Sequence, residues 1–255
     1  MSDTLTHFIN GEKVTADLVH QSLNPSNTND VVARFPAGGT AEVDAAVAAA
    51  RAAFPAWAGA TPEVRSDLLD RVGNAIMARA ADLGRLLSRE EGKTLPEGIG
   101  EVMRAARIFK YFAGEAIRRH GQTLDSTRPG IDVETHREPI GVVGLITPWN
   151  FPIAIPAWKI APALAYGNTV VFKPADLVPG SAHALSEIII RAGVPAGVFN
   201  LVMGRGSVVG EAMLQNPKVS AISFTGSVPT GRKVAQTCIT ADPMKKVQLE
   251  MGGKN

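Results

Sequence analysis

Apolar residues follow two different spacings along this chain. Between residues 40 and 120 they recur at helical intervals, which predicts a series of amphipathic helices. Helices are predicted to begin after N-caps at Thr40 and at Thr61, which precedes Pro62, and the helical pattern that follows Thr61 ends at Gly92. A further helix is predicted to begin at Pro96 and to end near Gly121. The first part of the chain is therefore expected to be mainly helical.

From residue 140 onward, short continuous apolar runs alternate with helical segments. The runs are 140–146, 169–172, 198–202, 219–224 and 247–249. Continuous apolar strands separated by helices are typical of a parallel sheet that is covered on both faces. The pattern predicts an α/β fold with a doubly wound, five-stranded parallel sheet of the Rossmann type. The last run is expected to be a buried strand that carries a carboxylate, Glu250, at its end.

A polar and apolar alternation at 130–139 separates these two regions. It contains too little apolar surface for a central strand. It predicts either a solvent-exposed hairpin arm or a strand that pairs with another subunit.

Composition narrows the classes of partner. Of the 255 residues, 45% are hydrophobic and 20% are charged, and the net charge of +2 favours neither nucleic acid nor a membrane surface as a partner. No apolar stretch has the length of a membrane span, and no signal peptide is recognisable. A single cysteine, Cys238, excludes an internal disulfide and is consistent with a reducing compartment, so we expect a cytoplasmic protein.

Polar residues follow four of the predicted strands. They are the segments TPWNFP (147–152), KPAD (173–176) and TGS (225–227), and Glu250. Because ligands of open parallel sheets bind at the carboxyl ends of the strands, we expect these groups to meet at one edge.

Each of these groups has a structural and a functional interpretation. Asn150 is either a turn residue between two prolines or an amide donor for an oxyanion. Lys173 and Asp176 are either a solvated loop pair or the ligands of a ribose. Ser227 is either a helix N-cap or part of a phosphate site at a helix start. Glu250 has the weakest structural interpretation, because a buried carboxylate is costly unless it is paired or used.

Three other features carry less weight. The glycines of GRGSVVG (204–210) have the wrong spacing and follow the wrong strand for a dinucleotide fingerprint. Cys238 lies on a predicted helix and is expected in the core, not as a nucleophile. The five histidines, at 7, 20, 120, 136 and 183, show no ligand spacing, so no metal site is expected.

The motifs TPWNFP, KPAD, FTGS and LEMGGK, in this order, resemble those of the NAD(P)-dependent aldehyde dehydrogenase superfamily. The resemblance covers essentially the whole chain and extends to semialdehyde enzymes, particularly 2-oxoglutarate semialdehyde (2,5-dioxopentanoate) dehydrogenases. It implies an aldehyde dehydrogenase type of Rossmann fold, NAD or NADP as cofactor, a small aldehyde as substrate, and a homodimer or homotetramer.

The resemblance also implies roles for individual residues. Asn150 matches the oxyanion amide, Glu250 the general base, and Lys159 a lysine that relays protons from it. Lys173 and Asp176 match the adenosine-ribose contacts, and Ser227 the pyrophosphate contact. Ile146, Thr147 and Trp149 match further cofactor contacts, and Phe151 matches a residue of the substrate tunnel. Asp176 stands where many NAD-preferring relatives carry glutamate. The shorter carboxylate leaves more room at this position, so the resemblance does not decide between NAD and NADP as the cofactor.

The resemblance divides the chain into three parts. Residues 1–120 match the mainly helical N-terminal part of the cofactor domain, 121–139 an oligomerisation arm, and 140–255 the Rossmann-like NAD(P)-binding domain. The nucleophilic cysteine of the family lies beyond the position of Glu250, so the chain is expected to be an N-terminal half that lacks the thiol domain and binds cofactor without turnover.

Two alternatives remain beside the semialdehyde interpretation. One is a non-catalytic nucleotide-binding or assembly module, and the other is a dehydrogenase for succinate semialdehyde or another aldehyde. A short-chain hydride-transfer oxidoreductase is set aside, because neither Tyr111 nor Tyr166 has a lysine four positions later.

Overall fold

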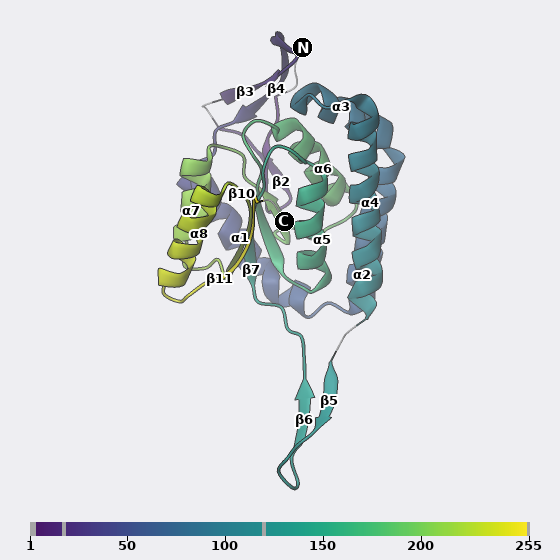
Figure 1. The fold of residues 1–255 in the computed structure, drawn as a ribbon, viewed down its shortest axis with the longest axis vertical. Coiled ribbons are helices and arrows are strands. Elements are labelled where there is room, and N and C mark those ends of the chain that lie inside the picture. The colour runs from purple at the N-terminus through teal and green to yellow at the C-terminus, as the bar shows by residue number, and fades with distance from the viewer. Residues whose placement is uncertain (1–3, 17–18, 119–120, 254–255) are drawn as a thin grey trace.

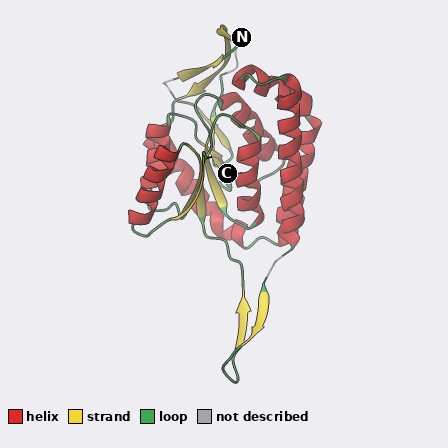
Figure 2. Ribbon diagram, in the orientation of Figure 1, coloured by secondary structure: helices red, strands yellow, loops and turns green. Residues whose placement is uncertain are grey.

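The computed structural model describes residues 4–16, 19–118 and 121–253. His120 and Lys254, and with them the boundary predicted at residue 120, lie outside the described residues. A central sheet is covered by helices on both faces, and a two-stranded hairpin extends from one end of the body (Figures 1 and 2).

The central sheet has seven strands in the order β11-β10-β7-β8-β9-β1-β2. The parallel strands are β7 (Val142–Ile146), β8 (Thr169–Lys173), β9 (Phe199–Leu201), β10 (Ala221–Gly226) and β11 (Lys246–Met251). The five predicted parallel strands are thus confirmed. The prediction that they make up the whole sheet is wrong, because β1 (His7–Ile9) and β2 (Glu12–Val14) extend it as antiparallel strands, so the sheet is mixed.

The two additional strands are too short to produce a recognisable period. Each has three residues; those of β1 are all buried, whereas β2 is mostly exposed. They are joined through Asn10 and Gly11, whose φ angles of 55° and 80° suit a tight hairpin turn. Phe8 aligns β1 with Leu201 of β9, so the N-terminal hairpin completes the sheet beyond β9.

Two layers of side chains hold the sheet between its helices. The helices are α1 (Thr40–Ala58), α2 (Pro62–Ala78), α3 (Ala80–Glu91), α4 (Leu95–Ile117), α5 (Ala154–Ala165), α6 (Pro179–Arg191), α7 (Glu211–Gln215) and α8 (Val228–Thr240). Helices α5 and α6, with α2 to α4 outside them, cover one face, while α1, α7 and α8 cover the other (Figure 1). Along β8 the side chains alternate between the two cores, since Val170 and Phe172 face one and Val171 the other.

The observed N-caps of the first two helices agree only partly with those predicted from the sequence. The predicted cap at Thr40 is wrong: Gly39 is the N-cap of α1, and its N–H donates to the Glu42 carboxylate at 2.7 Å. Because Glu42 lies three residues after Gly39, the cap is made by the carboxylate instead of a hydroxyl. At the start of α2 the prediction is confirmed, since the Thr61 hydroxyl accepts a hydrogen bond from the Val64 N–H at 3.4 Å.

The later helix boundaries are close to those expected. The helical pattern breaks at Arg79, between α2 and α3, and α3 ends at Gly92, whose φ of 97° suits glycine. Helix α4 begins one residue before the predicted Pro96 and ends at Ile117, short of Gly121. None of the helices in the described ranges is long and apolar enough to cross a membrane.

Two antiparallel pairs lie outside the central sheet. Strands β3 (Val19–Asn24) and β4 (Asn27–Pro36) form one, near the N-terminus. Strands β5 (Gln122–Asp125) and β6 (Asp132–Thr135) form the other, and every residue of both strands is exposed. The predicted hairpin arm is therefore confirmed as a hairpin that projects from the body (Figure 1).

Candidate functional site

The strand register brings the predicted site residues to one edge of the sheet. The last residue of β7, Ile146, pairs with Lys173 at the end of β8, and Thr225 near the end of β10 pairs with Glu250 on β11. The chain crosses from one side of β7 to the other between β9 and β10. Ligands of doubly wound sheets bind at such a reversal, outside the carboxyl ends of the strands.

Lys173 is buried at this edge with unused hydrogen-bonding capacity. Its ammonium lies 3.9 Å from the half-exposed Asp176 carboxylate and makes no hydrogen bond within the described part of the chain. Burial lowers the pKa of Lys173, and the charge of Asp176 opposes this shift. The interpretation as a solvated loop pair does not fit a buried lysine, whereas a ligand hydroxyl would fit it.

Thr147 supplies a second unsatisfied group. Its backbone N–H donates to the Lys173 carbonyl at 3.3 Å, which ties the loop after β7 to the end of β8. The side chain is buried, and its hydroxyl has no hydrogen-bond partner among the residues that the structure describes. Because Thr6, Thr169 and Ser181 also have buried hydroxyls without a partner in the described ranges, the Thr147 hydroxyl points to a polar ligand through its place beside the end of β8.

A cavity of about 310 Å³ lies beside these residues, between the π-helical turn Gly206–Gly210 and α8. Its lining includes Ile146, Gly206, Phe224, Thr230 and Val234. Ile146 is thus a wall of a cavity, as a cofactor contact would require. This volume suits one ring system of a ligand.

Ser227 occupies the N-terminus of α8. Its hydroxyl accepts a hydrogen bond from the Thr230 N–H at 3.4 Å and lies 2.9 Å from the Thr230 hydroxyl. The N-cap interpretation of Ser227 is therefore confirmed. The phosphate contact stays a prediction, and the same exposed helix N-terminus would serve it.

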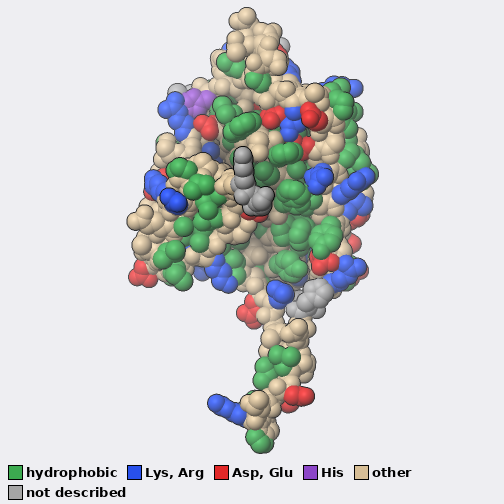
Figure 3. Space-filling model, in the orientation of Figure 1, with side chains coloured by type: hydrophobic (Ala, Val, Ile, Leu, Met, Phe, Trp, Pro, Cys, Tyr) green, Lys and Arg blue, Asp and Glu red, His purple; other side chains and the backbone are tan. Residues whose placement is uncertain are grey.

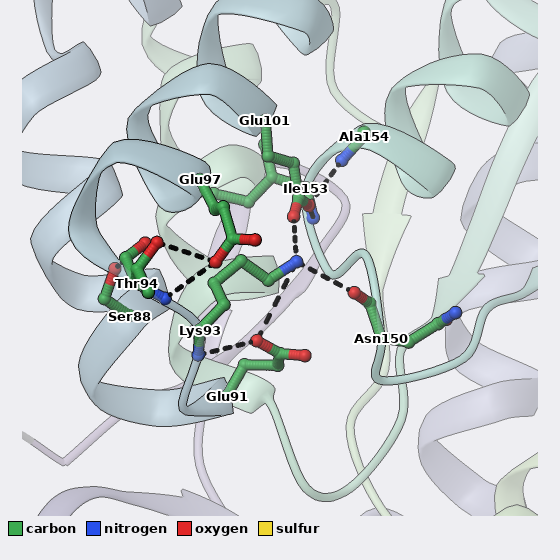
Figure 4. A network of polar contacts seen from close by, with 9 residues as sticks. All are labelled: Ser88, Glu91, Lys93, Thr94, Glu97, Glu101, Asn150, Ile153 and Ala154. Atoms are coloured by element: carbon green, nitrogen blue, oxygen red, sulfur yellow. Dashed lines mark hydrogen bonds and ion pairs between the residues drawn. The ribbon is translucent and has the colours of Figure 1, made fainter.

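The middle of the loop between β7 and α5, residues 149–151, presents its side chains to the outside. Trp149 and Phe151 are 52% and 46% exposed, and Asn150 is exposed as well. The Asn150 side-chain amide has no hydrogen-bond partner among the described residues, whereas its backbone carbonyl accepts a hydrogen bond from Lys93 at 2.9 Å (Figure 4). The amide is available to a ligand while the backbone is held.

Glu250 does not lie on a buried strand, which corrects the sequence interpretation. Strand β11 is the edge strand of the sheet, and Glu250 is exposed. Its two carboxylate oxygens accept hydrogen bonds from Thr225 at 3.1 Å and from Gln248 at 2.9 Å. An exposed carboxylate held by two neutral donors is placed to accept a proton from a ligand on its open side.

Lys159 is connected to Glu250 through Gln248. The Lys159 ammonium is buried and donates to the Ser223 hydroxyl at 2.8 Å and to the side-chain amide oxygen (Oε1) of Gln248 at 3.2 Å. The amide of Gln248 in turn donates to Glu250. Burial lowers the pKa of Lys159, and the charge of Glu250 opposes this. The sequence interpretation missed Gln248, although its position two residues before Glu250 places both on one face of the strand.

The lone thiol is not part of this site. Cys238 is fully buried on α8, and burial raises the pKa of its thiol, so the prediction of a core residue is confirmed. No group of three or more potential metal ligands occurs in the described ranges.

The fold and the site define an α/β protein with a candidate ligand site at the switch point of a doubly wound sheet. Residues 13–255 match the model of the aldehyde dehydrogenase family, and the chain belongs to this family. It corresponds to the N-terminal half of the family's members.

Three known proteins show how far this similarity extends. The chain is 42% identical to an alpha-ketoglutarate semialdehyde dehydrogenase of Haloferax volcanii, over 100% of this chain and 53% of the relative. It is 43% identical to the succinate-semialdehyde dehydrogenase (NADP⁺) of Escherichia coli, over 96% of this chain and 51% of the relative. A crystal structure of betaine aldehyde dehydrogenase from Staphylococcus aureus in complex with NAD⁺ has a TM-score of 0.93 at 35% identity, covering 98% of this chain and 50% of that one. The chain spans about half the length of the relatives it matches.

Proposed function

We propose that this chain forms the cofactor-binding part of an NAD(P)⁺-dependent aldehyde dehydrogenase that oxidises a semialdehyde to the carboxylate. The observation that carries the proposal is the convergence of Lys173, Thr147, Asn150 and Glu250 at one sheet edge, each with a group free to meet a ligand. Family membership supports the reaction class. A relative that is an alpha-ketoglutarate semialdehyde dehydrogenase supports 2-oxoglutarate semialdehyde as the substrate.

The residues at the edge fit a dinucleotide. In the proposal, Lys173 and Asp176 bind the adenosine ribose, Ser227 at the start of α8 binds the pyrophosphate, and the cavity beside Ile146 receives the adenine. The unpartnered Thr147 hydroxyl and the exposed Trp149 ring contact the rest of the cofactor. The bound cofactor would supply the hydride acceptor. Because Asp176 is one methylene shorter than glutamate, the site leaves room for either NAD⁺ or NADP⁺.

The remaining residues act on the aldehyde and on protons. Asn150 donates its amide to the oxygen that becomes negatively charged when a thiol adds to the carbonyl. Glu250 takes a proton from the thiol or from the hydrolytic water, and Gln248 links it to the Lys159 ammonium. Phe151 lines the approach of the substrate. Since Cys238 is buried, the thiol comes in this proposal from the part of the family fold that the chain does not span.

A larger cavity supports a substrate that carries a carboxylate. It has a volume of about 720 Å³ and lies between α4 and α5, where hydrophobic side chains gather over α5 (Figure 3). Its lining includes Arg104, Arg107, Tyr111, Phe112 and Trp158. Neither arginine is engaged in an ion pair within the described residues. Both arginines are exposed, and a guanidinium beside these aromatic residues is suited to the carboxylate of a semialdehyde.

The exposed hairpin supports an oligomer. Leu124, Ile131 and Val133 are 48%, 47% and 37% exposed on an arm that makes no sheet with the body. Apolar side chains on an unpaired two-stranded arm favour burial against another subunit. We therefore propose a homodimer or homotetramer for the whole protein.

Steady-state rates of nicotinamide reduction by the whole protein test this function. With both cofactors and a panel of aldehydes, we expect 2-oxoglutarate semialdehyde to have the highest kcat/KM, and succinate semialdehyde to follow. Replacing Arg104 by Met should lower kcat/KM for semialdehydes by about tenfold and leave unbranched alkanals unaffected. Cys238→Ser should retain activity.

Three results would contradict parts of the proposal. A preference for alkanals would overturn the substrate class. Loss of activity in Cys238→Ser without loss of folding would identify that thiol as the nucleophile. Cofactor binding without oxidation of any aldehyde would favour the non-catalytic nucleotide-binding module.

A further inference from the structure

Lys93 lies in the loop between α3 and α4, and its ammonium is the centre of a polar network (Figure 4). It donates to the Glu101 carboxylate at 2.7 Å and to the Asn150 backbone carbonyl at 2.9 Å, and lies 3.8 Å from the Glu91 carboxylate. It also lies 4.2 Å from the centroid of the Phe151 ring. One ammonium thus contacts two consecutive residues of the loop between β7 and α5.

Glu101 connects this ammonium to the start of α5. Its side chain, which extends from α4, is only 1% exposed. One carboxylate oxygen accepts the backbone N–H groups of Ile153 and Ala154 at 2.9 and 3.0 Å, and the other accepts from Lys93. Helix α5 has no side-chain cap of its own, so Glu101 satisfies its first donors from a neighbouring helix.

The two contacts hold the loop at its middle and at the end that leads into α5. Glu101 fixes the end that leads into α5, and Lys93 fixes the carbonyl of Asn150 and the ring of Phe151. Because these contacts use only the backbone of Asn150, its side chain extends away from Lys93 and keeps its amide unpaired (Figure 4). A charged network with little exposure gives the loop one position instead of several.

We propose that Lys93 and Glu101 are positioning residues that hold the Asn150 amide and the Phe151 ring in their working geometry. The inference rests on the proposed function, in which Asn150 stabilises an oxyanion. Neither residue touches substrate or cofactor in this account. They act on catalysis through the loop, since an amide displaced by about an ångström loses much of its effect on the transition state.

A double-mutant cycle in the whole protein tests the inference. We expect Lys93→Met to lower kcat by on the order of tenfold to a hundredfold, with the Kd for NAD⁺ unchanged. In an Asn150→Ala background the same substitution should cause almost no further loss of kcat, because the amide that it positions is gone, whereas the remaining Phe151 ring lines the approach of the substrate and acts on KM. Lys93→Arg should restore part of kcat. Lys110→Met is the matched control, since Lys110 is bonded to Asp70 in the same helical layer and should leave kcat unchanged.

A second variant covers the case in which Lys93→Met does not fold. Glu101→Gln keeps an acceptor for the N–H groups of α5 but removes the charge that Lys93 pairs with, and should show the same dependence on Asn150. Equal fold-losses in both backgrounds, or an unchanged kcat in Lys93→Met and Glu101→Gln, would overturn the inference. If Asn150→Ala itself has wild-type kcat, the proposed role of Asn150 fails, and the inference fails with it for that separate reason.

Discussion

Glu250→Gln is expected to lower the aldehyde-oxidising kcat of the whole protein by about 10²–10⁴-fold, the range typical of a lost general base. The glutamine keeps the size of the side chain and can still accept from Thr225, but it cannot take up a proton. The measurement is the steady-state rate of nicotinamide reduction at saturating aldehyde and cofactor. Glu187→Gln, on the outer face of α6 where Glu187 pairs with Arg191, is the control and should keep the wild-type rate.

The pH dependence adds a second test of this carboxylate. The charge of Glu250 raises the pKa of Lys159 against the lowering effect of burial. Removing that charge in Glu250→Gln should therefore lower the pKa of Lys159 further and move the alkaline limb of the residual rate to lower pH. A wild-type kcat in the variant would contradict the assignment of Glu250 as the base.

Asn150→Ala is the second substitution with a large expected effect. Removing one preorganised amide donor from an oxyanion site typically costs about 10²–10³-fold in kcat. The Kd for NAD⁺ should not change, because the backbone of residue 150 and the neighbouring Thr147 are retained. Rapid measurement of the first turnover would locate the loss in the step that adds the thiol to the aldehyde and transfers hydride.

The matched control is Asn74→Ala, on the exposed face of α2, which should leave kcat unchanged. An Asn150→Ala variant that binds cofactor and turns over at the wild-type rate would show that Asn150 serves only the turn. That result would restore the structural interpretation of this residue, in which two prolines and an asparagine do no more than shape a loop.

The sequence predicted the parallel strands because their apolar runs are continuous. Strand β8, with all five residues buried between two helical layers, has the composition that such burial requires. Strands β1 and β2 were missed because three residues cannot establish a period, although Asn10-Gly11 is a strong hairpin signal. This dipeptide predicts the hairpin, whereas its place beside β9 depends on the long-range pairing of Phe8 with Leu201.

The sequence of β11 alternates between apolar and polar residues, and the prediction of a buried strand overlooked this alternation. Val247 and Leu249 alternate with Lys246, Gln248 and Glu250, which is the period of a half-exposed strand. The structure places this strand at the sheet edge. The exposed face of β11 carries Gln248 and Glu250, which form the link to Lys159. The alternation along this strand therefore marks the residues that belong to the site.

The network around Lys93 could not be predicted from the chain. Lys93 and Asn150 are separated by 57 positions, and Glu101 reaches Ile153 across 52. Contacts of this range depend on how α4 packs against α5, and no local pattern encodes that packing. The motifs identified the loop that carries Asn150, whereas the tertiary structure was needed to find what holds it.

Calorimetric titration of the 255-residue chain with NAD⁺ tests most directly whether the sheet edge is a dinucleotide site. The account predicts saturable binding of one cofactor per chain, weakened about tenfold or more in Lys173→Met, because the buried ammonium then no longer bonds the ribose. Lys110→Met should bind as the wild type does. Absence of binding by the folded chain, or equal affinity in Lys173→Met, would contradict the account.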